Sequence, residues 1–187
     1  FVLSPEEYSV HGLTGDASAM AHAQMKSFQQ NAYLTARYRL RAWPLFALGD
    51  GGAIQNIRSD SLVRVQVYSA LAFGTQGLDY YCWGHGIREM ASPIQTAAKG
   101  SPSANYPFVK VANADAMRWG NMLIKSRHVG VIYSNQTNVK SAGAQPGVAP
   151  APTLPVTKAD SDLIIGVFND GSDQTSDSGY LMIVDLR

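Results

Sequence analysis

The sequence predicts an α/β fold, in which parallel strands and helices are followed by a small antiparallel β-domain. Apolar strand patterns alternate with helical patterns over residues 1–127. The strand pattern LDYYCW, residues 78–83, is largely apolar or aromatic on both faces, as is typical of a parallel strand covered by helices. From His128 the chain becomes rich in β-forming residues. We therefore expect one unit over 1–127 and another over 128–187.

The best-defined helix–strand unit lies between residues 59 and 84. Ser59 or Asp60 can cap the first amide groups of a helix, and Gly74 ends it. A turn at Gly77 then leads into the buried strand. The helix has an apolar face at the spacing i, i+4, i+7 and i+8. The residues of that face are Val63, Val67, Ala70 and Leu71.

Two further units precede this one. A short strand, Phe1–Leu3, is followed by a polar loop, and a helical pattern covers Ala17–Leu40. An apolar strand, Ala42–Leu48, comes next, and Pro44 is tolerable near the start of a parallel strand. The order strand, helix, strand, helix, strand implies crossover connections and a parallel sheet. The apolar face of the first helix consists of Ala21, Met25, Phe28 and Ala32.

The character of the chain changes after Trp83. Residues 84–111 show little periodicity, and long connections of this kind usually serve as functional loops or lids. A third helical pattern covers Asn113–Arg127. One face of that pattern consists of Met117, Gly120 and Ile124.

The last third of the chain predicts an antiparallel module. HVGVIYSN is β-rich, and residues 141–157 form a Pro/Ala/Gly-rich linker. DLIIGVFND and GYLMIVDLR read as the two strands of a hairpin. Three βα units cannot close an eight-stranded barrel, and the chain starts at Phe1 and stops at Arg187 within strand-like sequence. We therefore expect this chain to be a piece of something larger.

The composition excludes several classes of function. Lys and Arg number 15 against 14 Asp and Glu, and these charges are scattered along the sequence, which argues against a nucleic-acid partner. The single Cys82 excludes an internal disulfide, and no apolar run is long enough to span a membrane. No cluster has metal-ligand spacing and no phosphate-binding motif is present, so we expect no metal and no cofactor. Few charges with many small polar residues and tyrosines favour an extracellular or periplasmic protein.

Several motifs together resemble a known family. The order LSPEEYSV, helix, AWPLFALGDG, RVQVYSALAFGTQGLDYYCWG is similar to the last βα units of a clan A glycoside hydrolase, a (β/α)8 TIM barrel. ANADAMRWGNMLIKSRHVGVIYSN resembles the last barrel helix and the first strand of the β-domain that follows in that family. The resemblance implies a carbohydrate partner, with the missing barrel part supplied by a separate chain.

The resemblance also implies catalytic positions. These enzymes use two carboxylates that flank the glycosidic bond. The nucleophile is a Glu at the end of strand seven, where this chain offers Asp50, one methylene shorter. Asp50 lies among glycines, so a turn residue is the competing interpretation. Glu6 is a second candidate carboxylate, with a solvated loop residue as the alternative.

Four other residues are candidates for binding sugar. Trp83 would offer an aromatic plane at the end of a strand, although it could equally pack in the core. Tyr8 matches a tyrosine of the family at a strand end, and Glu7 and His85 could supply polar contacts. The predicted function is therefore binding or hydrolysis of glycosidic linkages in a barrel cleft. The alternative is a non-catalytic extracellular structural or assembly protein on a degenerate barrel scaffold.

Overall fold

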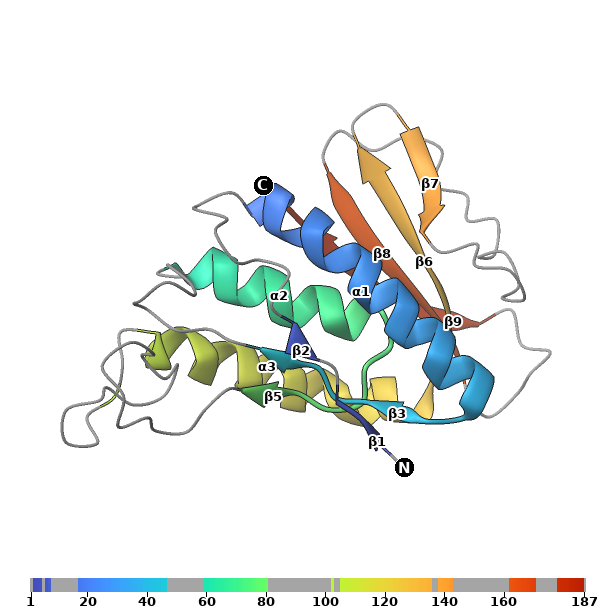
Figure 1. Ribbon diagram of the computed structural model, residues 1–187, viewed down its shortest axis with the longest axis horizontal. Helices are drawn as coiled ribbons and strands as arrows, with labels where there is room; N and C mark the ends of the chain where they lie inside the picture. The colour runs from blue at the N-terminus through green and yellow to red at the C-terminus, as the bar shows by residue number, and fades with distance from the viewer. Residues whose placement is uncertain are drawn as a thin grey trace.

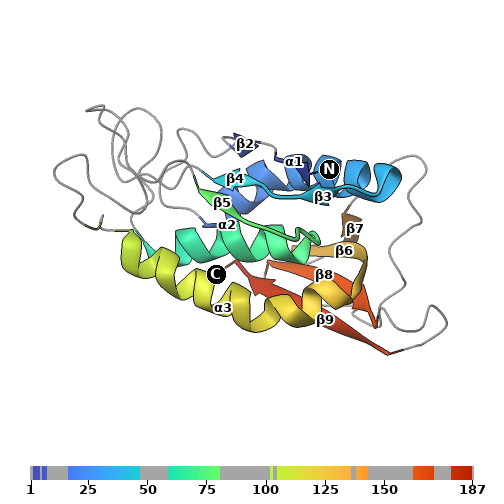
Figure 2. The same cartoon turned by 90° about the horizontal axis from the view of Figure 1, so that it is seen from below.

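Three layers make up the part of the chain that the computed structural model describes (Figures 1 and 2). Short parallel strands form one outer layer, helices form the middle, and a four-stranded antiparallel sheet forms the other outer layer. The described residues are 2–4, 6–7, 17–46, 59–80, 102, 105–135, 138–142, 162–170 and 178–186.

The parallel layer is built from three chain segments that lie in sequence order. The first segment contains β1 (Val2–Leu3) and β2 (Glu6–Glu7), and the second contains β3 (Arg41–Ala42) and β4 (Leu45–Phe46). Strand β1 pairs with β3, β2 with β4, and β4 with β5 (Asp79–Tyr80), always in parallel. This confirms the predicted parallel pairing. Glu6 and Glu7 form strand β2, so the expectation that these two residues belong to a polar loop was wrong.

Helix α1 (Ala17–Tyr38) follows the first segment and α2 (Asp60–Ala72) follows the second, as the sequence predicted. Ser59 caps α2 by accepting a hydrogen bond from the amide of Leu62 at 3.3 Å, which confirms one of the two predicted caps. The predicted strand Ala42–Leu48 is divided, because Trp43 and Pro44 separate its two short pieces. Pro44 has no amide hydrogen to donate to a ladder.

Helix α3 (Tyr106–Lys125) differs from the prediction in three ways. It ends at Lys125, and Arg127 already begins the next strand. It begins seven residues before Asn113, with Pro107 in its first turn, where the missing amide hydrogen of proline costs nothing. The expected face is exposed, since Met117 is 79% and Ile124 is 65% accessible. Val109, Ala112 and Leu123 are buried instead.

The antiparallel sheet has the order β7-β6-β8-β9. Its strands are β6 (Arg127–Asn135), β7 (Asn138–Ala142), β8 (Leu163–Asn169) and β9 (Gly179–Asp185). The predicted β-rich run and hairpin are confirmed, because β8 pairs antiparallel with both β6 and β9. Strand β7 includes the first two residues of the predicted linker, Ser141 and Ala142.

Helix α2 lies between the two sheets and holds the layers together (Figures 1 and 2). It contacts α1, α3, β8 and β9. The predicted face is buried, and so are Leu62 and Val65 on other sides of the helix. At Gly166 of β8 the sheet approaches the helix so closely that an added Cβ would lie 2.8 Å from Ala72 Cα. One hydrophobic core therefore spans both predicted units.

Two helices end in the same backbone motif but with different residues. After α2, the amide of Thr75 donates to Ala70 O at 3.3 Å, and Gly74 adopts φ +81°. After α1, the amide of Leu40 donates to Thr35 O at 3.1 Å, and Arg39 adopts φ +53°. Both are Schellman-type endings, in which the left-handed position is usually glycine. Arg39 is the non-glycine exception.

Candidate functional site at the strand ends

The three parallel segments end side by side. Glu7 is the register partner of Phe46, and Phe46 is the register partner of Tyr80. Parallel neighbours in a sheet lie about 4.8 Å apart, so the three carboxyl ends fall within about 10 Å of one another. The chain segments that directly follow these strands therefore begin at the same edge of the parallel layer.

The predicted site residues relate to this edge in different ways. Glu6 and Glu7 form β2, where Glu6 pairs in register with Leu45. Tyr8 follows the last residue of β2 in sequence, Asp50 comes four residues after β4, and Trp83 and His85 come three and five residues after β5. Tyr8, Asp50, Trp83 and His85 lie outside the described residues, as does Cys82.

Tyr80 fixes the end of β5 to helix α3. Its hydroxyl donates to Asn113 Oδ1 at 2.7 Å, and its ring lies 6.1 Å from that of Phe46. Burial raises the pKa of Tyr80 well above its usual value. The phenol therefore stays protonated and acts as a hydrogen-bond donor, which is a positioning role.

A hollow of about 620 Å³ lies beside this contact, between α3 and the segment that leads into β5. Its lining is mostly apolar and includes Leu71, Leu78 and Leu123. Asn113 and Asn121 supply amide groups on the α3 side, and Gln76 supplies one on the other. Mostly apolar walls with a few polar groups are typical of small-molecule sites, although the exposed Met117 also borders this hollow.

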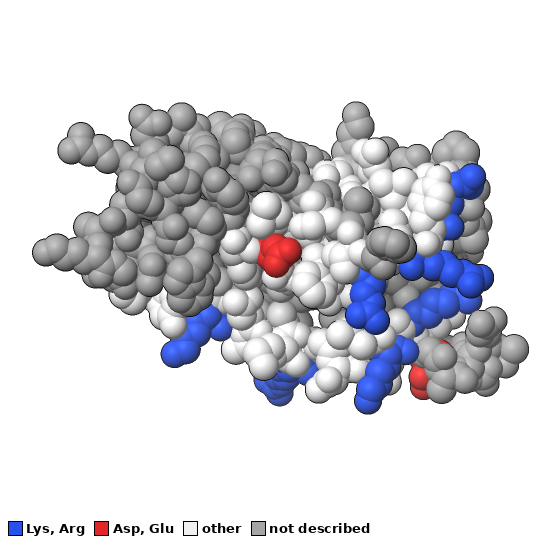
Figure 3. Space-filling view, turned by 60° about the horizontal axis from the view of Figure 1, so that its bottom comes forward, with Lys and Arg blue, Asp and Glu red and all other residues white. Residues whose placement is uncertain are grey.

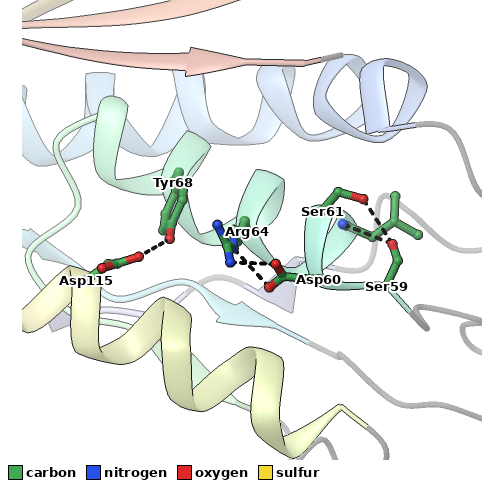
Figure 4. Close-up of polar contacts among 7 residues, drawn as sticks. Ser59, Asp60, Ser61, Arg64, Tyr68 and Asp115 are labelled. Atoms are coloured by element: carbon green, nitrogen blue, oxygen red, sulfur yellow. Dashed lines mark hydrogen bonds and ion pairs between the residues drawn. The ribbon is translucent and has the colours of Figure 1, made fainter.

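A hydrogen bond links α2 to α3, and an ion pair lies next to it on α2 (Figure 4). The Tyr68 hydroxyl donates to Asp115 Oδ2 at 2.6 Å, and Arg64 Nε donates to Asp60 Oδ1 at 2.9 Å. The ring of Trp119 meets that of Tyr68 edge to face at 5.2 Å. Arg64 and Tyr68 also line a smaller hollow, of about 290 Å³, against β9.

The electrostatics of these polar contacts favour a structural role. Burial, followed by the hydrogen bond to Asp115, raises the pKa of Tyr68 above its usual value. The hydrogen bond to Asp60 raises the pKa of Arg64, which is already always charged. Neither group can exchange protons near neutral pH. The hydrogen bond from Tyr68 to Asp115 holds α3 against α2, and the phenol and the guanidinium carry no acid–base chemistry at neutral pH.

We expect Tyr68→Phe to lower the free energy of unfolding by about 1–2 kcal/mol, because the part-buried hydrogen bond to Asp115 is lost while the ring contact with Trp119 remains. Tyr180→Phe is the matched control, since Tyr180 is 41% exposed, and it should change stability by less than about 0.5 kcal/mol. Urea denaturation of both variants measures the difference. Equal midpoints for the two variants would show that the contact is energetically neutral.

Sequence reasoning missed the pairing of Tyr68 with Asp115. The spacing of Asp60, Arg64 and Tyr68 at i, i+4 and i+8 places them on one side of α2, and this signal is readable from the sequence. The partner Asp115 lies 47 residues away, and only the packing of α3 brings it close.

Within the described ranges, no group of three His, Cys, Asp or Glu side chains could hold a metal ion. The same ranges contain no helix long and apolar enough to cross a membrane. No known protein family matches the chain, and no curated protein or solved structure is similar to it.

Proposed function

We propose that the protein is a carbohydrate-active protein of glycoside-hydrolase type, which binds or hydrolyses glycosidic linkages at the carboxyl edge of its parallel strands. The observation that carries the proposal is the common register of Glu7, Phe46 and Tyr80. Tyr8, Asp50 and Trp83 each follow one of these three adjacent strand ends by at most four residues in the sequence. Active sites of parallel α/β folds lie at this edge.

The order of the strands supports a barrel-type arrangement. Successive parallel segments pair as direct neighbours, with no strand inserted between them. This order fits a (β/α)8 barrel, which pairs successive strands throughout, and it also fits one half of a doubly wound sheet, whose order reverses only at the switch point. Because the sequence motifs resemble a barrel family, the proposal puts these strands in a larger barrel, with the remaining strands from a separate chain, and the protein outside the cytoplasm.

In the proposed site Asp50 is the candidate nucleophile and Glu6 a second carboxylate. Trp83 stacks on the face of a sugar ring, and Tyr8, Glu7 and His85 bind its hydroxyl groups. Retaining hydrolysis needs two carboxyl groups about 5–5.5 Å apart, and inverting hydrolysis needs about 6.5–9.5 Å. The shorter side chain of Asp50 favours the second candidate function, a non-catalytic structural or assembly protein that uses the same edge for binding.

Hydrolysis is tested by incubating the protein with a panel of oligosaccharides and measuring the release of reducing ends. If Asp50 is the nucleophile, Asp50→Asn lowers the rate at least about 100-fold, because an amide cannot form the glycosyl intermediate. Asp162→Asn, directly before β8 in the antiparallel sheet, makes the same change of charge away from the parallel strands and leaves the rate unaltered. Equal rates for the two variants would remove Asp50 from the mechanism.

Binding is tested separately through tryptophan fluorescence. The chain has three tryptophans, so the signal of Trp83 is the difference between wild type and Trp83→Phe. A saturable change with a neutral oligosaccharide that is lost in Trp83→Phe supports the sugar platform. Binding without hydrolysis would favour the non-catalytic function, and no change across a broad panel of glycans would reject both.

A further inference from the structure

Five positively charged side chains meet at the end of the molecule opposite the candidate site. They come from the end of α1, the start of β3, the end of α3 and the start of β6. All five are exposed, and we call this surface the basic end; it consists of Arg37, Arg39, Arg41, Lys125 and Arg127. Figure 3 shows most of the Lys and Arg side chains in that view gathered toward its right-hand side. The charges that look scattered in the sequence are brought together by the fold.

A short set of contacts explains why these segments lie together. The amide of Ala42 donates to Gln76 Oε1 at 3.0 Å, and Gln76 Nε2 donates to Gly74 O at 2.6 Å. Gly74 in turn packs directly against the ring of His128. Arg41 precedes Ala42 and Arg127 precedes His128, so each arginine is next in sequence to a residue that contacts this turn.

The backbone of Arg39 is the second observation. It occupies the left-handed position at the end of α1, where glycine is favoured and an L-residue is strained. The equivalent position after α2 is occupied by Gly74. Strained residues that persist are often found at binding sites, where the side chain is needed despite its backbone cost. Arg39 therefore keeps a guanidinium group at a place where stability alone would select glycine.

The neighbours of the cluster leave its charge available. The guanidinium of Arg37 stacks over the ring of Tyr38 at 5.7 Å, and Tyr38 is 59% exposed. Asp170 follows Asn169, the register partner of Arg127, so one carboxylate borders the surface. Four of the five cations are arginines, whose planar fork matches sulfate and carboxylate groups.

We propose that the basic end binds an acidic polysaccharide, a chain that carries sulfate or carboxylate groups. The choice of a polysaccharide rests on the proposed carbohydrate function, whereas the anion-binding surface does not. Proteins that bind single-stranded nucleic acid combine basic groups with free aromatic rings on which successive bases stack. Near the basic end the exposed ring of Tyr38 has Arg37 over it, and the exposed ring of Trp43 packs against Gly77. The surface holds the acidic chain by its charged groups, at a distance from the edge where a linkage would be cleaved.

The test compares dextran sulfate with neutral dextran, which has the same backbone. We expect the protein to bind dextran sulfate and not dextran, with affinity that falls roughly tenfold between 50 and 200 mM salt. Arg39→Gly should weaken binding roughly three- to tenfold while raising the melting temperature, because glycine relieves the strained backbone. Lys110→Ala at the other end of α3 removes the same charge and should leave binding unchanged.

Several outcomes would overturn the inference. They are equal affinity for dextran and dextran sulfate, equal loss in Arg39→Gly and Lys110→Ala, or tighter binding of an oligothymidylate or of anionic vesicles than of dextran sulfate. Failure of the proposed function is distinguishable from these. In that case dextran sulfate still binds through Arg39, while neutral oligosaccharides are neither bound nor hydrolysed. Conversely, if hydrolysis depends on Asp50 and dextran sulfate does not bind, the proposal for the basic end is rejected and the proposed hydrolysis stands.

Discussion

Gly166→Ala is expected to lower the free energy of unfolding by about 3 kcal/mol, one of the largest effects of a single methyl group in this protein. The added Cβ would lie 2.8 Å from Ala72 Cα and nearer still to the carbonyl oxygen of Ala72. Both contacts are with backbone, so no side chain can rotate away. The antiparallel sheet must move off the end of α2, which disturbs the packing of Phe168 and Ile164.

Gly120→Ala is the matched control for this prediction. Gly120 lies in α3, and nothing is within 4 Å of the position that its Cβ would take. Alanine is a better helix former than glycine, so this variant should be more stable by up to about 1 kcal/mol. Thermal and urea unfolding measure whether each substitution lowers or raises the stability of the protein. A stable Gly166→Ala variant would mean that the sheet and α2 are not held as closely as described.

The stability of the protein is expected to fall as the pH decreases from 6.5 to 4, because His128 cannot easily be charged in the folded state. Burial lowers the pKa of His128 to about 4, against 6.5 for an unperturbed histidine. Its Nε2 lies 3.1 Å from Ala72 O, and its ring lies 5.1 Å from that of Phe168.

The sign follows from proton binding. Between pH 6.5 and 4 the unfolded chain protonates this imidazole and the folded chain does not, so acid favours unfolding. The contribution of neutral His128 to the free energy of unfolding is fully present above pH 6.5. It declines by up to about 3 kcal/mol between pH 6.5 and 4, and it changes no further below pH 4. In His128→Gln the amide can still donate to Ala72 O but does not titrate. The difference in unfolding free energy between wild type and this variant should therefore depend on pH between 6.5 and 4, and a constant difference would contradict the assignment.

The sequence predicted the local elements of the fold better than their environments. The apolar periodicity of α2 identified Val63 and Val67 as one buried face. Periodicity cannot reveal that Leu62 and Val65 are also buried, because they are covered through packing with elements distant in the chain. The start of α3 was misplaced because Pro107 was taken to belong to a loop, although proline suits the first turn of a helix.

The candidate site was predictable only in part. Trp83 was selected as an aromatic residue at the end of a strand pattern, whereas Asp50 and Tyr8 were selected because the sequence resembles a barrel family. The common register of Glu7, Phe46 and Tyr80 comes from pairing between distant segments, which the sequence does not encode locally. The basic end escaped detection for the same reason, since Arg39 and Arg127 are 88 residues apart in the chain.

The central position of α2 has a consequence for synthesis on the ribosome. Strand β9, which covers one side of this helix, begins roughly a hundred residues after the helix ends. Translation proceeds at about 5–20 residues per second, so the apolar surface of α2 stays uncovered for on the order of 5–20 seconds before β9 is synthesised. During that interval the nascent chain exposes the apolar residues of α2 that the folded protein buries, and exposed apolar surface of this kind is what chaperones bind. Faster translation of the last third of the chain should therefore increase the soluble yield.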